Sequence, residues 1–217
     1  MIVNDDNNKL EPEKNDITRD FFDITETVAY ALIFVVLVFT FFFRIVGVEG
    51  DSMQQTLTPN DYVLITDFFY TPQRGNIVVI TEPDSDENKT FELYNDENIT
   101  AEPDNNKNVP LIKRIIAVGG DVVDLKNGEL YVNGKLIQES YISDAVTALR
   151  FDEPDIYPLT IKEGEVFVLG DNRPRSKDSR TLGPITQDHI LGLAFFRVYP
   201  FNKIGVIGNE EFKEIER

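Results

Sequence analysis

A serine and a lysine are the side chains of this sequence best suited to act together chemically. Ser52 follows closely after a charge-free apolar run, Val28–Phe43. A serine hydroxyl is a poor nucleophile without a base. Lys113 lies within the hydrophobic stretch Leu111–Val118, where desolvation disfavours the ammonium and lowers the lysine pKa. The pair therefore predicts a serine nucleophile activated by a neutral amine.

Taken singly, neither residue is decisive. Lys113 alone is also typical of a strand lysine that extends its amine to solvent. Ser52 alone is also typical of a turn or cap hydroxyl. The functional interpretation depends on the sequence around them.

Other catalytic chemistries are limited by composition. The chain has no cysteine and one histidine, His189. Thiolate nucleophiles, disulfides and cysteine-based zinc sites are therefore excluded, and a multi-histidine metal site cannot form. A serine–histidine triad would have to use His189, which lies in a polar segment typical of a surface. We expect no metal and no cofactor.

The net charge bears on binding partners. It is -17 at pH 7, whereas nucleic-acid binding needs clustered lysine and arginine. The same charge disfavours tight electrostatic docking on anionic lipid. We therefore expect no nucleic-acid partner.

The apolar run predicts a transmembrane anchor. As a helix, Val28–Phe43 spans roughly 24 Å, and Ile24, Ile45 and Val46 extend it to about a bilayer's hydrocarbon thickness. A cleaved signal peptide is one alternative, although the run is long and Arg44 follows it directly. A buried core helix is another, but apolar residues cover every face. We predict an anchor over residues 24–46.

The anchor divides the chain into three parts. Residues 1–23 are polar and predict a cytoplasmic tail. Lys9, Lys14 and Arg19 precede the anchor and Arg44 follows it, which favours a cytoplasmic N-terminus. The protein would then cross the cell membrane once, and residues 47–217 would form an extracytoplasmic domain.

That domain is expected to be mainly β, with a barrel-like or sandwich-like catalytic fold, because short apolar runs alternate with turn residues. The predicted strands are Tyr62–Thr66, Asn76–Thr81, Leu111–Val118, Asp121–Leu125, Glu129–Val132, Glu165–Leu169 and Leu193–Tyr199. Residues 82–110 are rich in acids and predict a solvated insertion.

Four sequence blocks carry a family resemblance. They are Gly50–Leu57 (GDSMQQTL), Gly75–Ile80 (GNIVVI), Ile112–Asp121 (IKRIIAVGGD) and Gly170–Gly183 (GDNRPRSKDSRTLG). Their order and spacing after an anchor resemble bacterial type I signal peptidases, membrane-bound serine proteases with a Ser–Lys dyad. The chain is most similar to the single-anchor form of Gram-positive bacteria.

The resemblance implies roles for individual residues. Ser52 would attack the scissile carbonyl to form an acyl-enzyme, and Lys113 would be its base. Ser176 would orient the lysine, and Asp178 and Arg180 would form a supporting ion pair. The oxyanion donor would be the backbone N–H of Ser52, with Gly50 as a second candidate. The residues implied to line shallow pockets for small side chains are Val48, Met53 and Ile112.

Three positions depart from the family pattern. Gly50 stands where a serine often supplies a second oxyanion donor, so no side-chain donor is assigned. Gln55 replaces the usual proline of the first block, and Asn76 replaces an aspartate in the second. None of these touches the dyad, but they leave room for a specialised substrate range.

The expected function is removal of N-terminal signal peptides from exported preproteins at Ala-x-Ala type sites. The partners would then be preprotein signal peptides and the lipid bilayer. One alternative is a self-cleaving repressor-type protein, which would need an N-terminal DNA-binding domain in place of the anchor. Another is a non-catalytic relative that assembles surface structures such as pili, with the acidic insertion as its binding surface.

Overall fold

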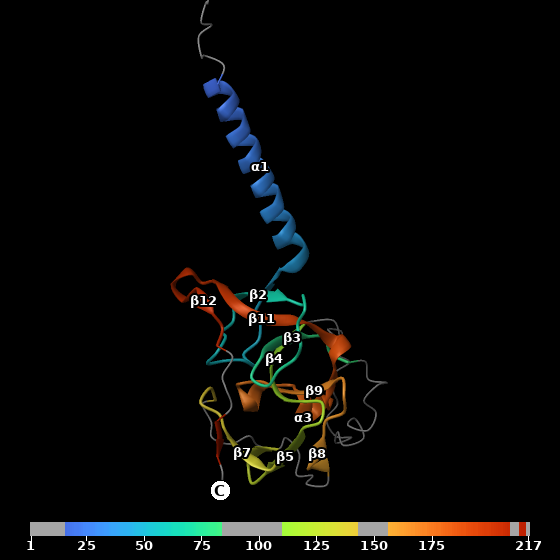
Figure 1. Cartoon of the computed structure of the whole chain (residues 1–217). Coiled ribbons are helices and arrows are strands. Elements are labelled where there is room, and N and C mark those ends of the chain that lie inside the picture. The colour runs from blue at the N-terminus through green and yellow to red at the C-terminus, as the bar shows by residue number, and fades with distance from the viewer. Residues whose placement is uncertain (1–15, 84–109, 143–155, 209–212, 216–217) are drawn as a thin grey trace, which may run out of the picture. The chain divides into compact units, whose positions relative to one another are not determined.

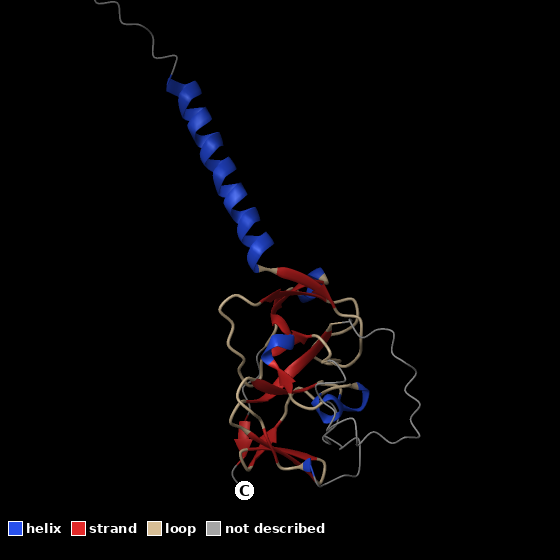
Figure 2. Cartoon of the chain, turned by 90° about the vertical axis from the view of Figure 1, so that its right-hand side faces the viewer, coloured by secondary structure: helices blue, strands red, loops and turns tan. Residues whose placement is uncertain are grey.

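A computed structural model describes residues 16–83, 110–142, 156–208 and 213–215. The chain forms two compact units, Met1–Phe41 and Phe42–Arg217. The first unit is helical, and the second consists mostly of strands (Figure 1, Figure 2). The predicted acidic insertion at 82–110 lies outside the described residues for all but its ends.

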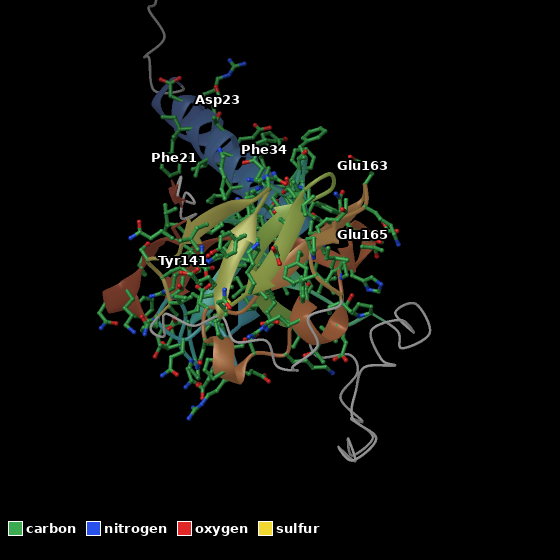
Figure 3. The ribbon with its side chains drawn as sticks, turned by 90° about the horizontal axis from the view of Figure 1, so that it is seen from below. Phe21, Asp23, Phe34, Tyr141, Glu163 and Glu165 are labelled. Atoms are coloured by element: carbon green, nitrogen blue, oxygen red, sulfur yellow. The ribbon has the colours of Figure 1, made fainter. Side chains whose placement is uncertain are left out.

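One long helix, α1, runs from Asp16 to Phe42. Its part Arg19–Phe42 is long and apolar enough to cross a membrane, because 24 residues span roughly 36 Å at 1.5 Å per residue. Phe21 and Phe34, labelled in Figure 3, are 64% and 67% exposed within the protein. The Thr40 hydroxyl donates to the Val36 carbonyl at 2.7 Å, so it does not remain unpaired on this apolar helix.

Both ends of the helix differ from the sequence prediction. The helix begins at Asp16, within the predicted tail 1–23, and ends at Phe42 rather than near residue 46. Residues Arg44–Gly47 form strand β1 instead. Ile45 and Val46 are β-branched and fit a strand as well as a helix, and pairing with β2 (Tyr62–Thr66) determines which one forms.

The larger of the two sheets contains eight strands, all paired antiparallel. Its order is β1-β2-β11-β3-β4-β9-β10, and β12 pairs with β11. The remaining bounds are β3 Ile77–Ile80, β4 Leu111–Val118, β9 Glu165–Leu169, β10 Ile185–Thr186, β11 Ile190–Tyr199 and β12 Gly205–Val206.

The smaller sheet contains five antiparallel strands in the order β13-β7-β6-β5-β8. Its bounds are β5 Val122–Lys126, β6 Glu129–Val132, β7 Lys135–Gln138, β8 Leu159–Thr160 and β13 Lys213–Ile215. Asn127 and Asn133 adopt positive φ in the two turns before β6 and β7, the conformation that tight hairpin turns require. The short helices are α3 Ser179–Leu182, η2 Arg173–Arg175, η3 Gln187–His189 and η4 Phe201–Lys203.

The mainly β fold class is confirmed, as are the bounds of four strands, β2, β4, β6 and β9. Strand β4 lies between β3 and β9 in the middle of the large sheet. The side chains of β4 do not alternate regularly along its whole length, because the register with β9 shifts between Ile115 and Ala117. Ile115 and Ala117 consequently pack into different core clusters. The shift is a β-bulge or similar irregularity, which re-aims the side chains that follow it.

Candidate active site

Ser52 lies in the turn that follows β1, against the loop that follows β9. The backbone N–H of Asn172 donates to the Ser52 carbonyl at 2.9 Å, and the Asn172 side-chain amide donates to the Asp51 carbonyl at 3.1 Å. The next side chain, Met53, is 1% exposed. The turn is therefore fixed from both sides of Ser52.

Lys113 approaches Ser52 from the central strand β4. Its Nζ donates to Ser52 Oγ at 2.9 Å and to the Ile112 carbonyl at 3.0 Å. The Lys113 residue is 1% exposed, so its amine is withdrawn from bulk water. The two residues that the sequence singled out are thus in direct contact.

The electrostatic environment favours a neutral amine on Lys113. Burial lowers the pKa of Lys113 to about 8, while the carboxylates of Asp178 and Asp171 oppose that shift and the Arg180 guanidinium adds to it. A lysine with this pKa is partly neutral near physiological pH and can accept the Ser52 proton. The arrangement can therefore generate a serine nucleophile.

Gly170 allows the β9 loop to approach this pair closely. A Cβ built on Gly170 would lie 2.2 Å from Ser176 Oγ and 2.6 Å from the Ser52 carbonyl oxygen. Real Cβ atoms do not tolerate such distances, so any side chain here would displace either Ser176 or Ser52. The glycine of the fourth sequence block is therefore required by space.

Ser176 lies beside Gly170, but the structure gives it no hydrogen bond to the lysine. Ser176 is 4% exposed, and its hydroxyl has no hydrogen-bond partner within the described part of the chain. A buried hydroxyl without a partner is costly. Orientation of Lys113 by Ser176 stays a prediction, and the Ile112 carbonyl is the orienting group that the structure contains.

Asp178 and Arg180 form a buried ion pair. Arg180 Nε and Nη2 each donate to the Asp178 carboxylate at 2.8 Å. Asp178 also accepts from the Gly170 N–H at 3.0 Å. The pair is thereby connected to the loop that contacts Ser52.

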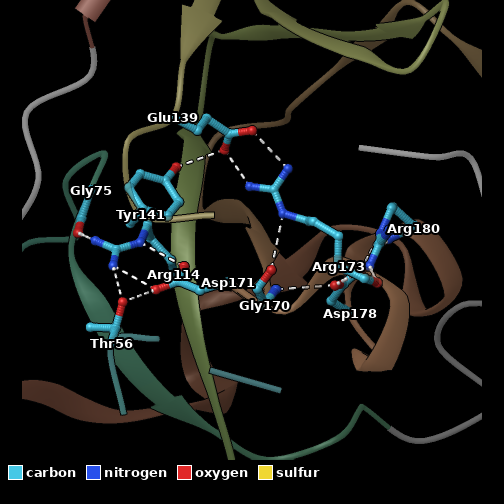
Figure 4. A network of polar contacts seen from close by, with 10 residues as sticks. All are labelled: Thr56, Gly75, Arg114, Glu139, Tyr141, Gly170, Asp171, Arg173, Asp178 and Arg180. Atoms are coloured by element: carbon cyan, nitrogen blue, oxygen red, sulfur yellow. Dashed lines mark hydrogen bonds and ion pairs between the residues drawn. The ribbon is translucent and has the colours of Figure 1, made fainter. Parts of the chain in front are cut away.

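A second buried pair joins all four sequence blocks. Arg114 donates from Nε and Nη2 to Asp171 at 2.8 and 2.7 Å and from Nη1 to the Gly75 carbonyl at 3.1 Å (Figure 4). The Thr56 hydroxyl donates to the same carboxylate. Neither side chain of the pair is exposed, and such buried charges persist only when they are paired and hydrogen-bonded.

The basic run in the fourth block is polar in sequence, which favours a solvated loop, but Arg173 and Arg180 are buried. Asp171 pairs with Arg114 from β4, and Arg173 pairs with Glu139. Only Arg175 and Lys177 of this run keep substantial exposure.

The three predicted pocket residues come together. Val48, Met53 and Ile112 belong to one buried hydrophobic cluster. The Cα of Gly50 lies in the open, with nothing within 4 Å of a built Cβ. Their roles toward a substrate stay predictions.

His189 lies apart from these residues. It is half-buried rather than on the open surface, and its Nδ1 lies 3.0 Å from the Thr81 hydroxyl. His189 ends η3 and contacts Thr81, the residue after β3. This contact does not involve Ser52 or Lys113. The predicted exclusion of His189 from the site is consistent with this contact.

Sequence reasoning missed two residues of the network. Glu139 and Tyr141 follow β7, outside all four sequence blocks, yet they contact Arg173 and Arg114. A Glu-x-Tyr pair after an amphipathic strand carries no distinct local signal, since Glu129 and Tyr131 show the same spacing.

Comparisons with known proteins identify the family of this chain. Residues 21–199 match the family described as signal peptidase, peptidase S26. The chain is 31% identical to signal peptidase I of Bacillus amyloliquefaciens over 90% of this chain and 97% of that protein. It is 32% identical to signal peptidase IB of Staphylococcus aureus strain MRSA252, over 85% of this chain and 93% of that protein.

A solved structure of signal peptidase I from Enterococcus faecalis V583 is also similar. It is 29% identical, with a TM-score of 0.39, and the match covers 57% of this chain and 97% of that one. The family match extends from α1 to the end of β11. The predicted resemblance is confirmed: this chain belongs to the signal peptidase family, peptidase S26.

Proposed function

We propose that this signal peptidase is a membrane-anchored serine endopeptidase that removes N-terminal signal peptides through Ser52 and Lys113. The observation that carries the proposal is the 2.9 Å contact between Lys113 Nζ and Ser52 Oγ. Burial that lowers the Lys113 pKa to about 8 supports the role of the lysine as a base.

The reaction would proceed through two half-reactions. Neutral Lys113 takes the Ser52 proton as Oγ bonds to the scissile carbonyl carbon, and the backbone N–H of Ser52 stabilises the oxyanion. The ammonium then gives its proton to the departing amine as the C–N bond breaks, which leaves an ester on Ser52. Lys113 next takes a proton from water as the water oxygen bonds to the ester carbonyl carbon. The bond from that carbon to Ser52 Oγ then breaks, Oγ takes the proton back from Lys113, and the signal peptide leaves with a new carboxyl end.

Specificity for small side chains rests on Val48, Met53 and Ile112. Only a small part of each is exposed, so a substrate would meet a shallow apolar surface. Such a surface suits alanine and excludes larger groups, as an Ala-x-Ala type site requires.

Membrane anchoring rests on α1 and on the apolar surface of the second unit. Several large apolar residues of that unit are well exposed, and they lie on β1, on η4 and β12 next to β11, and in the loop after β2. They are Ile45, Phe68, Phe69, Phe201, Ile204 and Val206. Exposed apolar surface of this extent is typical of proteins that contact membranes or partners.

Cleavage of a preprotein tests the catalytic proposal. The detergent-solubilised full chain is incubated with a preprotein, together with Ser52→Ala and Lys113→Ala. Lys126→Ala and Thr186→Ala are matched controls, because both residues lie on exposed strand positions. We expect cleavage by the wild-type chain and both controls and none by the dyad variants. Cleavage that survives Ser52→Ala or Lys113→Ala would refute the dyad, and no cleavage by any form would favour the assembly role.

Orientation is tested by labelling. Because the chain has no cysteine, single cysteines at Lys9 and Lys203 report their own positions. In intact cells, a membrane-impermeant thiol reagent should label Lys203→Cys and not Lys9→Cys. The reverse pattern would show the opposite orientation.

A further inference from the structure

Glu139 and Tyr141 form a buried unit that contacts neither Ser52 nor Lys113 in the hydrogen-bond network. Tyr141 is 8% exposed, and the Glu139 side chain is 4% exposed. The Tyr141 hydroxyl donates to Glu139 at 2.7 Å. Burial raises the pKa of Tyr141, so its hydroxyl keeps the proton that it donates. A buried carboxylate also needs a cationic partner.

Arg173 is that partner, and it connects Glu139 to the loop behind Ser52. Both terminal nitrogens of Arg173 donate to Glu139, one of them at 2.8 Å. Arg173 Nε donates to the Gly170 carbonyl at 3.0 Å (Figure 4). Because Gly170 packs directly against the Ser52 carbonyl, the guanidinium fixes the loop that supports the nucleophile.

Tyr141 connects the same unit to the strand that carries the base. The Arg114 guanidinium lies 4.0 Å from the centre of the Tyr141 ring, which is cation–π geometry. Arg114 directly follows Lys113 on β4, and its Nη2 lies 3.3 Å from the Thr56 hydroxyl in the turn after Ser52. Tyr141 therefore restricts the Arg114 guanidinium, which belongs to the strand of Lys113 and contacts the turn after Ser52.

We propose that Glu139 and Tyr141 are positioning residues that clamp the Ser52 loop and the Lys113 strand together through Arg173 and Arg114. The clamp rests on the proposed catalytic function. It matters because proton transfer depends on reacting atoms being held within a few tenths of an ångström. Its residues come from the segment after β7, so the smaller sheet contributes to the site in the larger one.

The chain contains a matched control for this clamp. Glu129 and Tyr131 have the same spacing, the Tyr131 hydroxyl donates to Glu129 at 2.6 Å, and the Lys126 amine lies 4.7 Å from the Tyr131 ring. That unit lies in the β5–β6 hairpin. It shares with the clamp the tyrosine–carboxylate hydrogen bond and a cation over the tyrosine ring, at half-buried positions and in another part of the fold.

The test compares Tyr141→Phe and Glu139→Gln with Tyr131→Phe and Glu129→Gln in the solubilised full chain. The kcat is expressed per active serine, titrated by acylation, so that loss of folded protein does not count as loss of rate. KM and the pH profile of kcat/KM are measured with the same peptide. We expect the clamp variants to lower kcat per site by about 10- to 100-fold and to move the apparent pKa of the base, with KM changed less than about twofold. The control variants should match the wild type.

The outcomes separate the clamp from the proposed function. A wild-type chain that does not cleave would overturn both. Wild-type cleavage with an unchanged kcat per site in Tyr141→Phe would overturn the clamp alone, as would an equal loss in Tyr131→Phe. If Glu139→Gln does not fold, Tyr141→Phe decides, because it removes only one hydroxyl.

Discussion

Lys113 and Arg114 are consecutive residues of β4, and both are buried, yet the protein accommodates their charges in opposite ways. Arg114 forms a bidentate pair with Asp171 and two further hydrogen bonds. Among the described residues, Lys113 has only a hydroxyl and a carbonyl oxygen as hydrogen-bond acceptors, and burial lowers its pKa to about 8. A buried charge is stabilised by pairing or disfavoured by desolvation. Pairing gives a rigid frame at Arg114, and desolvation gives Lys113 the lowered pKa that the proposed base requires.

The largest effect on stability is expected from breaking the Arg114–Asp171 ion pair. Arg114→Met leaves Asp171 buried without its cation, which should lower the free energy of unfolding by about 3–5 kcal/mol. Chemical denaturation of the solubilised chain, followed by near-UV circular dichroism, measures this loss. In the double variant Arg114→Met with Asp171→Leu, most of the stability should return. A single variant as stable as the wild type would show that the pair does not differ from a surface ion pair.

Substitution of the neighbouring Lys113 should raise the free energy of unfolding instead of lowering it. Lys113→Met should abolish activity, but it removes a group whose folded pKa, about 8, lies below the ordinary lysine value of 10.5. Between these values the unfolded chain binds more protons, so wild-type stability rises with pH there. Below pH 8 the variant should therefore be more stable by up to about 3 kcal/mol, and the difference should vanish above pH 10.5. Lys126→Met, at an exposed position, is the control, and a destabilised Lys113→Met would contradict the desolvated base.

The pH dependence of catalysis tests the same contrast through rate. If neutral Lys113 is the base, kcat/KM should rise about tenfold per pH unit below pH 8 and level off above it. Initial rates with a peptide substrate between pH 5 and 11 measure the profile. A midpoint near the pKa of an ordinary lysine would refute the proposed base, because Lys113 would then behave like a solvated amine.

The smallest effect on stability is expected at Thr56, which hydrogen-bonds to the Arg114–Asp171 pair. Thr56→Val removes the hydroxyl that donates to Asp171 and accepts from Arg114, while the guanidinium–carboxylate contacts remain. We expect a loss of about 1 kcal/mol in the free energy of unfolding. Thr186→Val on exposed β10 should change stability less. A loss as large as that of Arg114→Met would mean that the hydroxyl, rather than the ion pair, holds the frame.

Several elements were predictable because their signals are local. Leu111–Val118 is apolar except for Lys113 and Arg114 and is bounded by Pro110 and Gly119, and its predicted bounds equal those of β4. Strand β1 was missed because Ile45 and Val46 continue the apolar run beyond Arg44. Hydrogen bonds to β2, which lies further along the chain, decide that these residues form a strand.

The site shows the same division. The types and order of Ser52, Lys113, Asp178 and Arg180 are properties of the sequence, and they predicted a nucleophile, a base and an ion pair. Burial of Arg173 could not be read from its neighbours, because the run around it is basic and polar. Its carboxylate partner, Glu139, comes from the segment after β7.

The sequence by itself determined the residues available for chemistry, the apolar helix and the family. Its composition excludes cysteine and multi-histidine sites, and its four blocks specify the serine and the lysine. Only the tertiary structure decided the charge states of Lys113 and Arg114. Desolvation and pairing depend on atoms that folding brings from β3, β9 and the segment after β7, so the same strand can hold one paired cation beside one amine that loses its proton more readily than an ordinary lysine.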